Sequence, residues 1–261
     1  MKPLLNIQLL PLFAGILLCA SVARGQQGYR PNEDEFEPGP KTFVHPEKKH
    51  RSLFHRPNED TSAEQFASAM EREKAGRLRS AKDAYDDLVH HWHDSQEAPE
   101  AQFALARILF EQGKYEKSFK AFQYLIDHYA GRFSYNDALD YQHRIANQIM
   151  SDRWGDVLFM PGFEAPERAL PLLDQIIANG PNWNKAPGVR LTVGMIHENL
   201  KDYENAVTAY DAVEQHHARS PEAEDAAFRK AHCLYVLSEK TPRDEKRCRS
   251  ALSALASFLP R

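Results

Sequence analysis

The densest group of residues that could do chemistry is a run of three histidines, His90, His91 and His93, followed by Asp94. Imidazole and carboxylate groups are common zinc ligands, so this run is a candidate for a surface metal site. The sequence has neither an HExxH motif nor paired CxxC motifs, the usual spacings of zinc ligands. The run also falls at the expected end of a helix, where polar and cationic residues complement the helix dipole. We therefore expect no metal and no cofactor.

Catalytic and nucleic-acid-binding patterns find equally little support. The sequence lacks a Gly-rich phosphate loop and a G-x-S-x-G nucleophile motif, and its acidic residues fall on expected solvated helix faces. Lys and Arg number 33 against 37 Asp and Glu, for a formal net charge of −4. A nucleic-acid-binding protein would show a basic excess gathered on one face. We expect neither an enzyme nor a partner of nucleic acid.

Two cysteines, Cys233 and Cys248, flank an expected helix–helix turn near residue 240. In an antiparallel helical hairpin they would lie at similar height, so a disulfide could join them if the chain is exported to an oxidising compartment. Such a bond would stabilise the fold by roughly 3 kcal/mol in the chain-entropy account. The alternative is that both are small apolar core residues.

Export is indicated by residues 1–25, which have the pattern of a signal peptide. Lys2 supplies a positive start, an apolar stretch runs from Leu9 to Ala20, and small residues follow at small-x-small spacing. The alternative, an uncleaved anchor, requires a longer apolar run than this one. Lipidation of Cys19 is a third alternative, but Leu18 stands where a lipoprotein signal needs a small residue.

Residues 26–61 are predicted to be a disordered spacer, because they are rich in Pro and charge and show little periodicity. The string RPNED occurs twice in this region, at residues 30–34 and 56–60. It could be a short linear binding motif. The alternative is chance together with helix-start chemistry, since Asp60, Thr61 and Ser62 are good N-cap residues.

From Ser62 onward one pattern recurs, in which a turn residue is followed by an apolar residue two positions on, a small residue three later and an aromatic residue four later. The three copies are Gly76, Leu78, Ala81 and Tyr85, then Gly113, Tyr115, Ser118 and Phe122, then Lys201, Tyr203, Ala206 and Tyr210. The first two copies lie 37 residues apart, close to the 34-residue period of tetratricopeptide repeats. The turn residue favours glycine, the small residue permits close helix approach, and the aromatic fills the gap to the next hairpin.

Two weaker hairpins complete the array. One is predicted from helices over 134–151 and 165–179, joined by a longer loop over 153–164, and the other from helices over 221–238 and 243–259. The sequence therefore predicts an all-α, tetratricopeptide-type solenoid of about five helical hairpins over residues 62–261.

Several segments of this array are similar to one known family. They are Glu100–Ala106 leading into Gly113–Tyr115, Tyr124–Tyr129, Asn136–Leu139, Ile145–Asn147 and Ser220–Ala223. Over residues 62–261 the chain resembles the BamD (YfiO) type of tetratricopeptide proteins of Gram-negative outer-membrane biogenesis. The resemblance implies a periplasmic scaffold, associated peripherally with the outer membrane, that binds the assembly platform for β-barrel proteins and unfolded barrel precursors. The alternatives are a general periplasmic adaptor for cell-wall, division or transport complexes and a peptide-capturing module for transport or signalling.

The partner would occupy the concave face, which the first helices of such hairpins line. Aligning the copies places nine residues there, namely Phe66, Met70, Lys74, Phe103, Arg107, Phe110, Leu191, Met195 and Glu198. Exposed Phe and Met beside Arg and Lys would suit an extended or helical peptide with a terminal carboxylate. The alternative is that Phe66, Phe103 and Phe110 are core residues, as an apolar helical stripe usually is.

Overall fold

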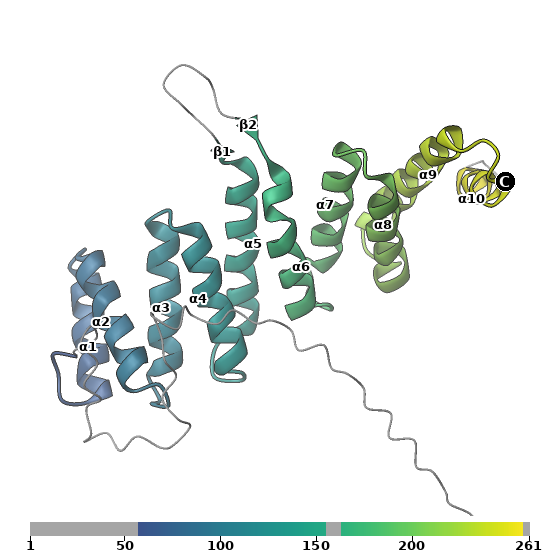
Figure 1. Ribbon diagram of the computed structural model, residues 1–261. Coiled ribbons are helices and arrows are strands. Elements are labelled where there is room, and N and C mark those ends of the chain that lie inside the picture. Colours follow the sequence, from purple (N-terminus) through teal and green to yellow (C-terminus); the bar gives the residue numbers. More distant parts are fainter. Residues whose placement is uncertain (1–56, 155–162, 258–261) are drawn as a thin grey trace, which may run out of the picture.

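The computed structural model describes residues 57–154 and 163–257, which form a row of five helical hairpins (Figure 1). The pairs are α1 (Ser62–Lys74) with α2 (Leu78–His91), α3 (Ala98–Glu111) with α4 (Tyr115–His128), α5 (Tyr135–Ser151) with α6 (Leu170–Asn179), α7 (Ala186–Asn199) with α8 (Tyr203–His217), and α9 (Glu222–Lys240) with α10 (Glu245–Ala256). The predicted all-helical solenoid is confirmed. Within these two ranges, no helix has the length and apolar character that crossing a bilayer requires.

The predicted signal peptide, Cys19 and all but the last residues of the predicted spacer lie outside the described residues. At the start of the described part, α1 begins at Ser62, and Thr61 caps it by accepting a hydrogen bond from the backbone N–H of Glu64 at 3.2 Å. This is one of the three N-cap candidates that the sequence offered, and it satisfies a backbone donor that would otherwise have no partner in the helix.

The third hairpin carries the predicted longer connection. Strands β1 (Arg153–Trp154) and β2 (Phe163–Glu164) pair antiparallel at its base. The second helix of this hairpin begins as a 3-10 turn, η1 (Pro166–Ala169), before α6 starts. Pro166 lies at the start of η1 and Pro171 in the first turn of α6. Both positions suit proline, which fits the first turn of a helix and not its interior.

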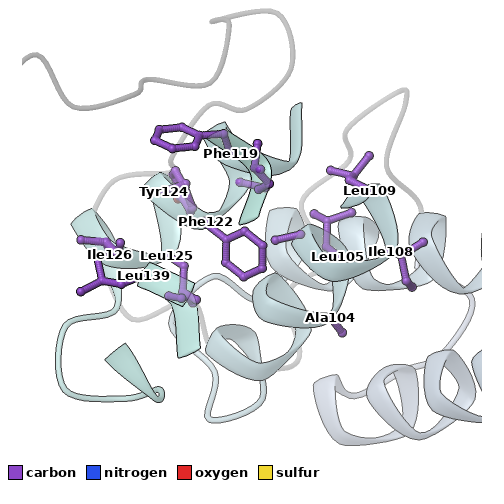
Figure 2. Packing of buried hydrophobic residues seen from close by; sticks show 14 of the residues in the cluster. Ala104, Leu105, Ile108, Leu109, Phe119, Phe122, Tyr124, Leu125, Ile126 and Leu139 are labelled. Carbon is purple, nitrogen blue, oxygen red and sulfur yellow. The ribbon is translucent and has the colours of Figure 1, made fainter. Parts of the chain in front are cut away.

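The small and aromatic residues of the repeated motif are buried, as close packing of the helices requires. Its small residues, Ala81, Ser118 and Ala206, are buried, and so are its aromatic residues, Tyr85, Phe122 and Tyr210. Figure 2 shows the ring of Phe122 directed from α4 towards Leu105 of α3, among the other buried side chains of these two helices. Aromatic burial of this size is the main stabilising contribution at each joint between helices.

A buried glutamine ties the two helices together in each of the first two hairpins. The side-chain amide of Gln65 donates to the carbonyl of Ala84 at 3.0 Å, and that of Gln102 donates to the carbonyl of Ala121 at 2.9 Å. Both glutamines are buried. Because an unpaired buried amide is costly, each bond fixes the register of its hairpin.

The first residue of the motif has positive φ in all three copies: +72° at Gly76, +70° at Gly113 and 62° at Lys201. The left-handed conformation costs a residue with a Cβ about 1–2 kcal/mol. Glycine avoids that cost but loses more conformational entropy on folding. We therefore expect Lys201→Gly to raise the unfolding free energy by about 0.5–1 kcal/mol, measured by urea denaturation.

The control for this prediction is the preceding residue, Leu200, which is half-exposed and has φ −75°. Leu200→Gly should lower the unfolding free energy by about 1 kcal/mol. The backbone of Leu200 is already in the right-handed region, so glycine relieves no strain at this position. Equal changes at the two positions would contradict the strain at Lys201.

Candidate peptide-binding groove

Five of the nine predicted groove residues line one pocket of about 400 Å³ between the first two hairpins. Phe66, Met70 and Lys74 come from α1, and Phe103 and Arg107 come from α3. The other residues that line it are Glu73, Tyr85, Glu100 and Ala104. The alignment of the repeats thus brought together side chains 29 to 41 positions apart in the chain, and we call this pocket the α1–α3 groove.

The aromatic residues of the groove also belong to the packing of the hairpins. The Phe66 ring lies 5.7 Å from that of Tyr85, and the Phe103 ring lies 5.3 Å from Phe122 and 5.7 Å from Tyr141, between ring centroids. Phe66 and Phe103 are nevertheless only half-buried. Each ring therefore has one side in the core and one side on the groove, so the two sequence-based alternatives both apply.

Arg107 is held inside the groove by acidic neighbours. Its guanidinium donates to Glu73 and, at 3.0 Å, to Glu111. The hydroxyl of Tyr85 donates to the other oxygen of Glu73 at 2.9 Å. Burial lowers the pKa of Arg107, but the hydrogen bond and charge of Glu73 outweigh burial and raise it. The charge of Arg107 is thus already compensated, which weakens the prediction that it binds a peptide carboxylate.

Lys74 is the cation that the groove leaves available. Its side chain is exposed at the end of α1, and it makes neither an ion pair nor a hydrogen bond with any residue that the structure describes. An unpaired ammonium beside an apolar wall can attract a carboxylate without first breaking another ion pair.

The remaining predicted residues lie outside this groove. Phe110 packs against Tyr115 and Tyr141, and the guanidinium carbon of Arg144 lies 4.6 Å from its ring centroid. Leu191 and Met195, in α7, pack against a separate cluster of buried residues that α8 and α9 form. Four of the nine residues therefore do not line the α1–α3 groove.

Glu198, the last of the nine, is the centre of a second polar cluster. It accepts hydrogen bonds from the hydroxyl of Tyr210 at 2.7 Å and from the guanidinium of Arg229 at 3.3 Å. This repeats the arrangement of Glu73, Tyr85 and Arg107: a glutamate on the first helix of a hairpin, a tyrosine on its second helix and an arginine on the next hairpin. We call it the Glu–Tyr–Arg clamp.

Sequence reasoning missed this clamp, although a signal was present. In both copies the glutamate precedes the motif tyrosine by 12 residues. In the second hairpin, the corresponding positions are Phe110 and Phe122, 12 residues apart as well, and Arg144 lies over the Phe110 ring instead of bonding a carboxylate. The joint is therefore polar in two hairpins and aromatic in one.

The disulfide considered between Cys233 and Cys248 is not formed, and both thiols are free. Cys233 is fully buried in the cluster that contains Ala206 and Tyr210, so it faces back towards the preceding hairpin. The sulfur of Cys248 lies 4.0 Å from the carbonyl of Pro242 in the turn. The two thiols thus have different surroundings, since one packs against α8 and the other lies beside the turn.

The histidine run lies at the end of α2, as predicted. Nδ1 of His93 is 2.7 Å from the hydroxyl of Tyr129 and 3.2 Å from that of Tyr124. Burial, the largest cause, lowers the pKa of His93. The His93 ring also packs against those of Tyr124 and Tyr129, so this histidine belongs to the packing between the first two hairpins.

Two family models of the tetratricopeptide repeat match the chain, over residues 66–133 and 188–214. A search of curated protein sequences gave no match. Among solved structures, YrrB, titled a TPR protein with an unusual peptide-binding site, is 17% identical, with 77% of this chain and 90% of that chain covered and a TM-score of 0.36. A tetratricopeptide repeat protein from Parabacteroides merdae is 12% identical, with 74% and 72% covered and a TM-score of 0.36.

MamA from Desulfovibrio magneticus is 11% identical, with 76% of this chain and 97% of that chain covered and a TM-score of 0.34. Identity to all three structures is low, so the assignment depends on the family models and on the motif that recurs in the hairpins. A solenoid of this class is suited to protein–protein interaction, and both matching family models describe this repeat. Residues 66–133 and 188–214 thus match tetratricopeptide-repeat models, and the described residues form a helical solenoid of the tetratricopeptide type.

Proposed function

We propose that this protein is a non-enzymatic scaffold that binds a peptide segment of another protein in the α1–α3 groove. The observation that carries the proposal is the combination, in one pocket of about 400 Å³, of half-buried Phe66, Met70 and Phe103 with the unpaired ammonium of Lys74. Apolar anchors with a single polar contact for orientation are a common way to bind peptides. Lys74, rather than Arg107, receives the carboxylate of the bound segment.

The cellular setting is part of the same proposal. The signal-peptide pattern of residues 1–25 supports export to the periplasm, and the resemblance to the BamD type supports a role in assembling outer-membrane β-barrel proteins. The alternative is a general periplasmic adaptor for cell-wall, division or transport complexes. The same groove would serve either role, because repeat proteins share packing residues and differ in the groove.

The test is site-specific photo-crosslinking in intact cells. A photoreactive phenylalanine at Phe66 replaces one aromatic ring with another, and the same residue at Leu252, exposed on α10, is the matched control. Position 66 should give adducts that contain the barrel-assembly platform or barrel precursors, and position 252 should not. Adducts with cell-wall enzymes would favour the adaptor. Identical adducts from both positions would remove the groove from the proposal.

The role of Lys74 predicts a specific loss of binding. For the crosslinked segment made as a peptide, Lys74→Glu should weaken binding about fivefold, because an exposed ion pair contributes up to about 1 kcal/mol. Fluorescence anisotropy would measure the dissociation constant. Lys114 is an exposed lysine outside the groove, so Lys114→Glu should leave the dissociation constant unchanged. Lys74→Glu should likewise have no effect on the binding of a peptide whose carboxylate is blocked. Equal losses for both lysines would indicate only long-range charge.

A further inference from the structure

Three different metal-binding side chains converge where the fourth and fifth hairpins meet. Glu198 comes from α7, and His232 and Cys233 come from α9. One ligand atom from each, a carboxylate oxygen, an imidazole nitrogen and the thiol sulfur, lie within 4.8 Å of one another. Nδ1 of His232 is 3.2 Å from Oε1 of Glu198. Residues 34 positions apart in the chain thus present their polar atoms to one point.

These separations are close to those of a tetrahedral zinc site. Zinc bonds of about 2.0–2.3 Å at tetrahedral angles place neighbouring ligand atoms about 3.3–3.6 Å apart. The pair formed by His232 and Glu198 already fits, and the sulfur of Cys233 must approach by at most about 1.3 Å. Side-chain rotation covers a movement of this size without a shift of either helix.

The surroundings of Glu198 are also those of a metal ligand. Tyr210 and Arg229 both donate to Oε2, which leaves Oε1 turned towards His232. Hydrogen bonds to the second oxygen of a ligating carboxylate fix its orientation. Arg229 is shared with Asp225, at 3.0 Å between Nε and Oδ1, so its positive charge is compensated beside a bound cation.

The three proposed ligands differ in solvent exposure, and the difference indicates the side from which a metal could enter. Cys233 is fully buried and the side chain of Glu198 is 17% exposed, whereas that of His232 is 53% exposed. A metal could therefore enter from the His232 side, and a water molecule or a group from a partner would complete the coordination. The buried side supplies the low-dielectric surroundings that strengthen ionic bonds.

We propose that Glu198, His232 and Cys233 form a zinc-binding site that links α7 to α9. A thiolate, an imidazole and a carboxylate together suit Zn²⁺, and a set with soft sulfur and nitrogen ligands disfavours Mg²⁺ and Ca²⁺. On binding, the S–H bond of Cys233 breaks, the proton passes to solvent and sulfur binds the metal. A free cysteine thiol is mostly protonated at neutral pH, so the site should release about one proton per zinc ion.

Cobalt titration of the full chain, purified without a histidine tag, tests the site. Co²⁺ should produce thiolate-to-cobalt charge-transfer absorption, and Zn²⁺ should abolish it by displacement. Calorimetry in two buffers of different ionisation enthalpy counts the released protons. Cys233→Ala should remove the charge-transfer band, and His232→Gln should weaken zinc binding roughly tenfold or more.

The controls separate this site from the other candidates in the chain. Cys248→Ala, the other free cysteine described, and His93→Gln, in the histidine run, should leave the band and the affinity unchanged. Circular dichroism checks that each variant keeps its helices. His232 is exposed, so His232→Gln remains informative if Cys233→Ala does not fold. The proposal would be overturned if the chain bound Zn²⁺ by calorimetry but gave no thiolate-to-cobalt band with Co²⁺. A cobalt band that survives in Cys233→Ala would overturn it as well.

Discussion

Alanine at Gly194 should destabilise the protein by about 2 kcal/mol, although alanine normally stabilises the interior of a helix. A Cβ built at this glycine of α7 would lie 2.3 Å from Cε1 and 2.6 Å from Cδ1 of Tyr210. The ring is fully buried, and its hydroxyl is held by Glu198 at 2.7 Å, so it has little room to withdraw. Overpacking of this kind costs about 1–3 kcal/mol or more, which exceeds the gain of about 1 kcal/mol from helix propensity.

The same helix offers a matched control. A Cβ at Gly188 would meet nothing closer than an oxygen of Glu222, at 3.7 Å. Gly188→Ala should therefore raise the unfolding free energy by about 0.5–1 kcal/mol. Urea denaturation of both variants gives the comparison. In the first hairpin, the position that corresponds to Gly194 is Ala69. A small loss at Gly194 would therefore mean that α7 and α8 can also accommodate a Cβ at this position.

Truncation of Phe103 should cost about 2–3 kcal/mol, even though this side chain also lines the groove. Its ring meets those of Phe122 and Tyr141, so alanine would leave a cavity at the joint of three helices. Truncating a fully buried phenylalanine to alanine costs about 3–5 kcal/mol, and the expected loss is smaller here because Phe103 is only half-buried. Phe66→Ala should cost less, since within the described part of the chain the Phe66 ring packs against one other aromatic ring, that of Tyr85.

This prediction bears on how groove variants are read. A loss of peptide binding in Phe103→Ala would mix a missing contact with a loosened hairpin. Phe103→Leu keeps most of the volume and should cost less than about 1.5 kcal/mol, so it is the better variant for binding studies. Thermal unfolding followed by circular dichroism would rank the three variants. A fully stable Phe103→Ala protein would assign this ring to the groove alone.

The hairpins could be predicted from the sequence because their motif combines several independent requirements. The turn at Gly76 and Gly113 needs positive φ, and the aromatic positions need burial, so a match to both is improbable by chance. Helix ends were less accurate: the last helix was expected over 243–259, and α10 spans Glu245–Ala256. Asp244 caps α10 by accepting from the backbone N–H of Arg247, so the helix begins two residues later than expected.

The candidate site could be predicted only in part. Periodicity identified nine side chains on the first helices of the hairpins as partly accessible, and all nine are at least partly exposed. Periodicity does not say which of them share a pocket, because that depends on the angle between successive hairpins. It also missed the neutralisation of Arg107, whose partner Glu73 lies 34 residues earlier. The three zinc ligands were missed for the same reason, since Glu198 lies on a different hairpin from His232 and Cys233.

Most of the buried hydrophobic side chains fall into two clusters, and this division should affect local unfolding. One cluster extends from α1 to α7, and the other joins α8 to α9 with Leu191 and Met195 of α7 at its edge. In repeat proteins, stability is a sum over neighbouring units, so a smaller cluster opens at lower free energy than the whole. Amide hydrogens of α8 and α9 should therefore exchange faster than those of α3 and α4. Faster exchange confined to α8 and α9 would mark the C-terminal end as a cooperative unit distinct from the hairpins that form the α1–α3 groove.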